Sequence, residues 1–538
     1  MIKIIYNANI YTLDSQQPYA SAIAIDGERI LMAGDDQSIR EALAWRRPDV
    51  EILDAGGRTI IPGLTDAHIH LEQYALGLRK VDCETPTRLE CLRRVSERAQ
   101  QLAPGEWILG HGWNQNDWAE GFGNAADLDA SVPHHPVYLT AKSLHAAWVN
   151  SAALNAAGVN QRTLDPPGGR IGRDEHGNPN GIVFEGAMGV IEVAIPEPTL
   201  EQVTQAIREA LPGLARMGLT GLHDFDQRRC FSALQLLRQQ GELTLRVIKG
   251  IPLDDLHHAA ALGLRTGFGD DYLRIGGIKA FADGALGPRT AAMLQPYEGE
   301  PDNRGMLLLD AEQLYEYGRL ALENGFSMAV HAIGDRANHE VLNAFTQLRS
   351  YERHHSDIRA SALFPLRHRI EHVQIIHPSD AGRLAELGII ASMQPIHGPS
   401  DMLMADRYWG SRAAFSYGWR TQVDQGAILA FGSDAPVESP NPFWGLYAAI
   451  TRRRLDGSPG AEGWYPTQRL TLSEALRNFT YGPAYAAYAE ERQGKLARGF
   501  LADLLVLDKD PFHSEPDAIK DIRPLATMVG GEWIFLEI

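Results

Sequence analysis

Residues 60–70 read IIPGLTDAHIH, an apolar run that ends in two histidines separated by one residue. Such a run is typical of a strand buried in a parallel sheet. Side chains at positions i and i+2 of a strand point the same way, so His68 and His70 can face one point. Two imidazoles that face one point suit a divalent metal ion, although a His-x-His pair also arises by chance or inside a core. The stretch therefore predicts a strand whose end carries chemistry.

Apolar runs of similar length recur along the chain, with helical segments between them. Two capping boxes, Asp310 to Gln313 and Thr471 to Glu474, mark expected helix starts. Strands that alternate with helices predict an α/β fold with a parallel sheet. In a barrel of such strands, side chains at the strand C-termini meet at one open mouth, where function is expected. The runs are GLTGLHDF (218–225), IGGIKAFADG (275–284), SMAVHAIGD (327–335), HRIEHVQII (368–376), IIASMQPI (389–396) and AILAFGSDAP (427–436).

Both chain ends have a different pattern, which indicates antiparallel strands. Asp26-Gly27 separates two apolar runs near the N-terminus, and Gly530-Gly531 does the same near the C-terminus. Residues 1–62 and 490–538 are therefore expected to form one small composite β-sandwich domain, with the barrel at 63–489. Residues from about 104 to 215, rich in Trp, Asn, Gly and Pro, are expected to form a large insertion or lid after the first barrel strand.

The composition limits the classes of function. The chain has 538 residues, of which 44% are hydrophobic, and a net charge of −18 that is spread along the sequence. Acidic charge of this kind disfavours a nucleic acid partner. Three cysteines without Cys-x-x-Cys spacing fit neither a disulfide framework nor a thiolate zinc cluster. Since no stretch approaches about 18 uninterrupted apolar residues, no membrane association is predicted and the expected location is cytoplasmic.

Other strands also carry side chains of the kinds found in metal sites. His331, His372 and Asp434 each end a different predicted strand, and Lys279 lies within another. So many ligand-type residues at strand ends would be an odd coincidence if they had no common role. The ammonium group of Lys279 has no lone pair to offer a metal, so the bare residue leaves its role open.

Together these residues carry a resemblance to a known family. The phrases PGLTDAHIH, SLHAAWVNSAAL, IKAFADGALGPRTAAML, VHAIGDRAN, RIEHVQ and GSDAPVESPNPFWGLYAAITR are similar to those of the metal-dependent amidohydrolase superfamily. Within it they resemble the amidohydrolase-3 or YtcJ-like branch, which includes N-substituted formamide deformylase. The resemblance spans nearly the whole chain.

The resemblance implies a distorted (β/α)8 TIM barrel that holds a binuclear metal centre of two divalent cations, most often zinc. His68, His70 and Asp434 would bind the more buried ion, and His331 and His372 the more exposed one. Lys279 would bridge both ions as a carbamate formed with carbon dioxide. Without carbamylation of Lys279, a site for one metal becomes the expectation.

The implied activity is hydrolysis of a non-peptide C–N bond in a small molecule, such as an N-acyl or N-formyl amide. A metal-bound hydroxide would attack the substrate carbonyl, and Asp434 would take the proton of the attacking water and return it to the leaving amine. Asp335 is expected to orient a metal-binding imidazole, because Glu371 should point away from His372 on a strand. The candidates to contact substrate are Trp113, His145, Glu185, Asp283 and Arg289.

Other functions stay open on the sequence. A similar barrel with one metal deaminates purines and pyrimidines, but those enzymes place a glutamate soon after the fifth-strand histidine, and VHAIGD has none. Cyclic amides and esters remain alternative substrates. A non-catalytic homologue would lack ligands, whereas all six candidates are present. Relatives are often dimers, and since no interface signature is visible, formation of a homodimer is left open.

Overall fold

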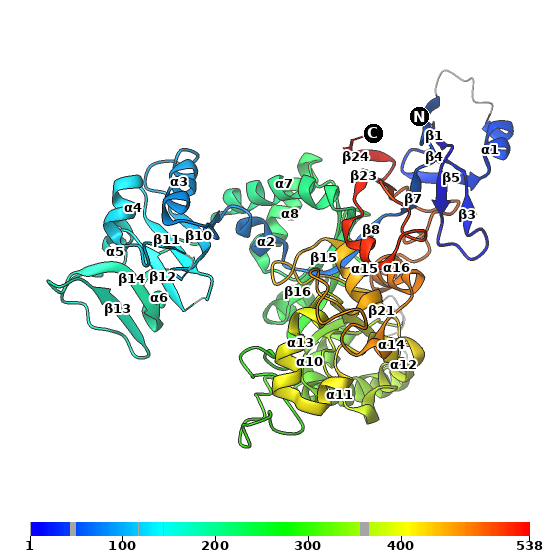
Figure 1. Cartoon of the computed structure of the whole chain (residues 1–538). Helices are drawn as coiled ribbons and strands as arrows, with labels where there is room; N and C mark the ends of the chain where they lie inside the picture. The colour runs from blue at the N-terminus through cyan, green and yellow to red at the C-terminus, as the bar shows by residue number, and fades with distance from the viewer. Residues whose placement is uncertain (1, 44–49, 117, 144, 356–364, 538) are drawn as a thin grey trace. The chain divides into compact units, whose positions relative to one another are not determined.

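Eight parallel strands form a single curved sheet in the computed structural model, which describes residues 2–43, 50–116, 118–143, 145–355 and 365–537 (Figure 1). The strands follow one another around the sheet in chain order. An isolated parallel bridge from Ile69 to Ala435 joins the last strand to the first, so the sheet is a nearly closed barrel, which confirms the predicted α/β barrel. The strands are β8 (Leu64–Ile69), β15 (Leu219–Asp224), β16 (Arg246–Pro252), β17 (Leu273–Phe281), β18 (Met328–Ala332), β19 (Arg369–His372), β20 (Ile390–Met393) and β21 (Leu429–Phe431).

One of these strands, β16, has no counterpart among the apolar runs of the sequence. Its run is interrupted by Arg246 and Lys249, which are nevertheless buried. Arg246 Nε lies 2.7 Å from Asp503 Oδ2, and Lys249 Nζ lies 2.9 Å from Asp224 Oδ2. Paired in this way, the two cations can occupy the interior, which is why apolar patterning misses the strand.

Helices surround the barrel (Figure 1). The two predicted capping boxes are present, at Asp310 for α10 (Ala311–Glu323) and at Thr471 for α16 (Leu472–Phe479). Each box satisfies backbone N–H groups that a helix start leaves without partners. The remaining helices of this part are α2 (Leu71–Gly77), α7 (Leu200–Arg216), α8 (Arg228–Gln240), α9 (Leu256–Ala261), α11 (Asp335–His354), α12 (Arg383–Leu387), α13 (His397–Trp409), α14 (Trp419–Asp424), α15 (Pro442–Thr451) and α17 (Tyr481–Ala486).

Two further sheets lie outside the barrel: one is formed by strands near the N-terminus alone, and the other combines strands from both chain ends. One sheet has the order β5-β4-β1-β6 and the other β24-β23-β22-β7-β2-β3. The two ends lie side by side (Figure 1). Lys3 Nζ near the N-terminus donates a hydrogen bond of 2.6 Å to the Gly531 carbonyl near the C-terminus. The strands are β1 (Ile2–Tyr6), β2 (Asn9–Tyr11), β3 (Tyr19–Ala20), β4 (Ala22–Asp26), β5 (Arg29–Gly34), β6 (Val50–Asp54), β7 (Thr59–Pro62), β22 (Leu504–Leu507), β23 (Pro524–Val529) and β24 (Glu532–Leu536); α1 (Asp36–Leu43) follows β5.

The stretch 60–70 contributes strands to two different sheets. Its first residues belong to β7 of the chain-end sheet, and its last to β8 of the barrel. Gly63 lies between them, and a Cβ at this position would come within 2.3 Å of the Thr220 side chain. A glycine is therefore needed where the chain passes from one sheet to the other.

A second compact unit comprises Ala75–Ala206, and the first comprises Met1–Tyr74 with Ile207–Ile538. The sequence predicts an insertion at about 104–215. The compact unit begins before that range, because it also includes β9 and α3. Its sheet has the order β13-β14-β12-β11-β10-β9. The elements are β9 (Val81–Asp82), α3 (Arg88–Ala99), β10 (Ile108–Trp113), α4 (Ala125–Ser131), β11 (Val137–Ala141), β12 (Ala146–Val149), α5 (Ser151–Ala156), β13 (Gly169–Arg173), β14 (Pro179–Glu185) and α6 (Gly186–Glu192).

Helices with the character of a membrane span are absent from the described ranges. None of them combines the length and the apolar composition that crossing a bilayer requires.

Candidate metal centre

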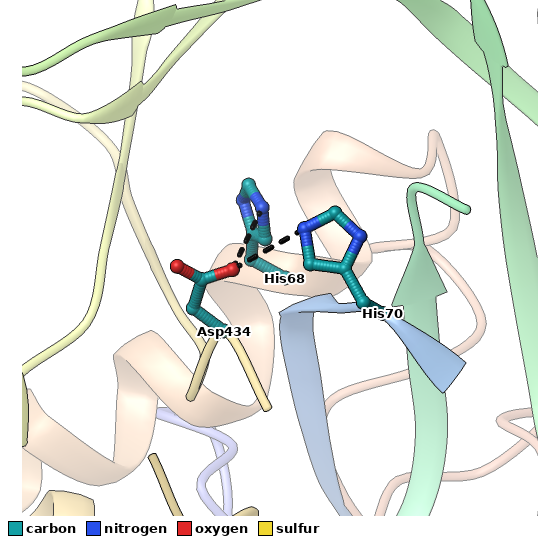
Figure 2. Close-up of side chains that lie close together, drawn as sticks. All are labelled: His68, His70 and Asp434. Atoms are coloured by element: carbon teal, nitrogen blue, oxygen red, sulfur yellow. Dashed lines mark ion pairs between the residues drawn. The ribbon is translucent and has the colours of Figure 1, made fainter. Parts of the chain in front are cut away.

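His68, His70 and Asp434 converge at the C-terminal end of β8 (Figure 2). His68 Nε2 and His70 Nε2 each lie 3.4 Å from the same oxygen, Asp434 Oδ1. An ion bound tetrahedrally with bonds of about 2.0–2.1 Å holds its ligand atoms about 3.3 Å apart. The two distances therefore match those between ligands of one divalent cation, and the three residues form a potential metal-binding group.

The two histidines of β8 are oriented by acidic partners. His68 Nδ1 lies 2.6 Å from Glu371 Oε2, and His70 Nδ1 lies 3.1 Å from Asp226 Oδ1. A carboxylate on Nδ1 fixes the ring and leaves Nε2 with its lone pair, which is the usual arrangement of a metal-binding histidine. His68 Nε2 is buried and has no hydrogen-bond partner in the described chain. Such an orphaned atom fits a metal ligand.

His331 and His372, at the ends of β18 and β19, stand next to this group. Their ring centroids are 4.6 Å apart, and the His372 ring is 4.8 Å from that of His68. His372 Nδ1 lies 2.8 Å from Gln394 Oε1, and His331 Nε2 lies 2.9 Å from the Gly284 carbonyl. In each ring one nitrogen is held by a protein oxygen and the other can bind a metal. The nitrogen available to a metal is Nε2 in His372 and Nδ1 in His331.

One of the converging residues, His372, has a strained backbone. Its φ of 77° lies in the left-handed region, which residues other than Gly, Asn and Asp rarely adopt; Asp434, with φ of 61°, belongs to a residue type that tolerates this region. Residues held this way gather at functional sites, because the surrounding structure must compensate the strain.

Lys279 lies in β17 with its side chain entirely in the interior. Its Nζ has no hydrogen-bond partner in the described residues and lies 4.7 Å from the centroid of the Phe225 ring. The same Phe225 ring adjoins His68, and the two ring centroids are 4.5 Å apart. Burial lowers the pKa of Lys279 to about 8. An unpaired lysine in this position is costly, so a further group is needed to accompany it.

Burial and charge set the protonation of the converging residues. Burial lowers the pKa of His68 to about 4 and that of His331 to about 3, so both are neutral at pH 7. Burial also disfavours a charge on His70, but hydrogen bonds to Asp226 and Asp434 outweigh it and raise its pKa to about 9. Burial opposes ionisation of Asp434, yet His68 and His70 hold its pKa well below the ordinary value. A cation bound here would displace the proton of His70.

Glu371, rather than Asp335, orients a histidine of this group. The sequence predicts Asp335 for this role, but Asp335 Oδ1 instead accepts a hydrogen bond of 2.7 Å from the Leu294 backbone N–H. Glu371 reaches His68 inside the barrel, although the His372 ring beside it in sequence also adjoins the His68 ring. Arg369 NH2 lies 2.9 Å from Glu371 Oε2 and helps to keep the carboxylate ionised. Alternation along β19 gives no information about His68, which lies on β8, a strand that does not pair with β19.

Comparison with known proteins agrees with this geometry. The model of the amidohydrolase family matches residues 51–535. The chain belongs to the amidohydrolase family. It is 30% identical to the putative amidohydrolase YtcJ of Bacillus subtilis over 98% of both chains. It is 28% identical to the N-substituted formamide deformylase of Arthrobacter pascens over 98% of this chain and 97% of that one. The crystal structure of an uncharacterized metal-dependent hydrolase from Pyrococcus furiosus has a TM-score of 0.77 and 29% identity, and covers 95% of this chain and 100% of its own.

The amidohydrolase has two of its predicted substrate contacts in the same unit as the histidines. Asp283 is buried and accepts backbone hydrogen bonds from Ala292, Ile333 and Gly334, so it holds the turn that follows His331. Arg289, with φ of 57°, forms an ion pair with Glu300 and is half-exposed. Asp283 therefore stabilises this turn through backbone hydrogen bonds. The charge of Arg289 is neutralised by Glu300.

The other three predicted contacts lie in the second unit. Trp113 is buried in its core, where the indole N–H donates a hydrogen bond of 2.7 Å to the Leu139 carbonyl. His145 and Glu185 are exposed, and His145 Nδ1 lies 3.0 Å from Glu185 Oε1. The burial of Trp113 assigns it to packing, while His145 and Glu185 form an accessible polar pair.

Three residues of the amidohydrolase site are absent from the sequence prediction. Asp226 directly follows the run GLTGLHDF, Gln394 directly follows β20, and His397 comes four residues after the last residue of β20. All three stand just beyond the C-terminal end of a barrel strand, where functional side chains are expected. This position after a strand is the signal that could have identified the three residues, but none of them belongs to a sequence motif of its own.

Proposed function

We propose that this amidohydrolase cleaves the C–N bond of a small non-peptide amide with the help of two divalent cations, most suitably zinc. The observation that carries the proposal is the spacing of His68, His70 and Asp434, whose ligand atoms lie at distances suited to one tetrahedral ion. The kinship with N-substituted formamide deformylase at 28% identity supports N-acyl and N-formyl amides as the first substrates to try.

A second ion would be held by His331 and His372, whose free nitrogens adjoin the first group. Lys279 would complete both positions as a carbamate, in which its amine adds to carbon dioxide and releases one proton. The carbamate turns a donor that cannot bind a metal into an oxygen ligand. Its support is that Lys279 Nζ is buried without any hydrogen-bond partner in the described residues.

Divalent cations in such a site activate a water molecule and polarise the substrate carbonyl. The chain itself supplies the proton transfer. Asp434 directs Oδ1 at the two imidazoles, and its second oxygen, Oδ2, takes no part in those ion pairs (Figure 2). Oδ2 would take the proton from the attacking water and return it to the nitrogen that leaves. Glu371 and Asp226 keep His68 and His70 in the orientation that leaves Nε2 unprotonated.

The test is the metal content of protein purified without chelator, measured by elemental analysis, together with the intact mass under gentle ionisation. We expect two ions per chain and an added carbon dioxide. His68→Ala should lose the more buried ion, whereas His258→Ala, which changes an exposed imidazole on α9, should keep both. If His68→Ala folds and retains the full metal content, the ligand assignment is wrong. One ion without the carbamate would favour the single-metal deaminase.

A further inference from the structure

His397 is a fifth imidazole at the barrel mouth. It begins α13, four residues after the last residue of β20. Its ligand atom and those of His372 and Asp434 all lie within 4.8 Å of one another. The residue is 5% exposed, and its Nε2 is buried without a hydrogen-bond partner in the described chain. A buried nitrogen of this kind, next to the candidate metal ligands, calls for a partner that comes from outside the protein.

The surroundings of His397 differ from those of the four other imidazoles. His68, His70, His331 and His372 each have one ring nitrogen fixed by a protein oxygen. Neither nitrogen of His397 has a hydrogen bond to any group in the described part of the chain. Metal-binding histidines almost always have the first arrangement, because the second nitrogen must be oriented. His397 lacks it and so is better suited to meet a substrate than a metal.

The backbone around His397 is nevertheless firmly held. A Cβ on Gly398 would lie 2.9 Å from the Trp419 ring, so the first turn of α13 packs closely against that ring. Arg454 donates hydrogen bonds of 2.9 and 2.7 Å to the carbonyls of Pro399 and Ser400. The imidazole therefore stands on a fixed support, as a group that stabilises a transition state requires.

We propose that His397 is a catalytic residue whose Nε2–H donates a hydrogen bond to the carbonyl oxygen of the substrate. This inference rests on the proposed amide hydrolysis. When the oxygen of water adds to the carbonyl carbon, the C=O π electrons move onto the carbonyl oxygen, and His397 stabilises that negative charge without giving up its proton. The proton of the water passes through Asp434 to the nitrogen as the C–N bond breaks, which yields a carboxylic acid and an amine.

Three variants test the role of His397 in the metal-loaded protein. His397→Ala removes the donor, His397→Gln keeps an N–H near the position of Nε2, and His258→Gln is the control at an exposed histidine. The readouts are metal content, the dissociation constant of methylphosphonate by calorimetry, and turnover of N-acetyl and N-formyl amides. Methylphosphonate imitates the tetrahedral adduct of an acetyl amide, so it reports on the oxyanion position even when turnover is not observed.

We expect all variants to hold the metal content of the wild type. His397→Ala should weaken methylphosphonate binding roughly tenfold or more and lower kcat by about 10²- to 10³-fold, the loss typical of one oxyanion donor. His397→Gln should recover part of both, and its milder change keeps the test available if the alanine variant fails to fold.

Loss of one metal ion in both His397 variants would overturn the proposal, because it would make His397 a ligand. Unchanged methylphosphonate binding and turnover would overturn it as well. If the wild type hydrolyses no amide while methylphosphonate binding still depends on His397, the amide hydrolysis fails and the oxyanion-binding role of His397 is supported.

Discussion

Glu371 shows how one residue can govern a site without touching the ion. Its carboxylate is fully buried between His68 and Arg369. Arg369 NH2 also donates a hydrogen bond of 2.7 Å to the Ala67 carbonyl of β8, so the pair connects β19 to the strand that carries His68 and precedes His70. The orientation of His68 and the cohesion of the barrel interior thus depend on the same carboxylate.

We expect Glu371→Gln to weaken metal binding and to destabilise the fold. The amide can still accept a hydrogen bond from His68, but it leaves Arg369 buried without a counter-charge. Loss of one partner of a buried pair costs about 3 kcal/mol or more in free energy of unfolding. Loss of an orienting carboxylate lowers metal affinity by about 10- to 100-fold. Denaturant unfolding and competition with a chelator measure the two effects.

Asp335→Asn is the matched control, because Asp335 is the carboxylate that strand alternation selects from the sequence. Its structural task is to accept the backbone N–H of Leu294, which an asparagine oxygen can also do. Metal affinity should stay at the wild-type value. A control that lost metal as strongly as Glu371→Gln would remove the distinction between the two carboxylates.

The sequence predicts the ligand-type residues far better than their partners. His68, His331, His372 and Asp434 could be named because a parallel barrel brings the ends of all its strands to one mouth. The hydrogen-bond partners come from other strands and from the residues after them, as Asp226 does, so their positions depend on how strands lie beside one another. No periodicity along a single strand contains that information.

At the scale of elements, the closure of the barrel is what assembles the site. Asp66 of β8 accepts hydrogen bonds of 3.0 Å from the His68 and Ser433 backbone N–H groups, and so ties β8 to the residues after β21. Gly432 lies inside this junction, where an added Cβ would come within 2.5 Å of both Asp66 Oδ1 and the His68 nitrogen. The junction sets the distance between His68 and Asp434, which lie at the first and the last strand of the barrel.

We expect Gly432→Ala to separate the two strands at the junction. Overpacking of this kind costs about 1–3 kcal/mol in free energy of unfolding, and here it also moves Asp434 relative to His68. Thermal unfolding should show a lower Tm, and elemental analysis should show loss of the more buried ion. Gly213→Ala, in α7 with open space around its Cβ, should instead leave metal content unchanged and raise stability slightly. Equal behaviour of the two variants would contradict this account of closure.

The same elements show where prediction from sequence stops. Seven of the barrel strands correspond to apolar runs, and β16 was missed because paired cations interrupt it. The run 60–70 was predicted as one strand but is divided at Gly63 between two sheets. Apolar patterning detects burial, but it cannot tell which sheet buries a strand.

Across the whole molecule, both chain ends have hairpin signals, and strands from both ends share one sheet. The limits of the second unit have no such local signal. Its β9 and α3 lie before the stretch rich in Trp, Gly and Pro, and only the pairing of β9 with β10 assigns them to the unit. Composition marks the loops of such a unit better than its edges.

The unit Ala75–Ala206 should fold on its own. Its sheet is formed within the unit, and two apolar clusters pack against that sheet, one around Trp113, Trp118 and Trp148 and the other around Val149, Val183 and Ile191. A chain of roughly 130 residues is long enough to bury a core of its own. We expect the isolated fragment to unfold in a single cooperative transition, followed by tryptophan fluorescence. Of its four tryptophans, the three of the first cluster adjoin one another at ring-centroid distances of 5.9 and 6.2 Å, and Trp107 packs against the second cluster. A fragment with exposed tryptophans and no cooperative transition would show that the unit needs the rest of the chain to fold.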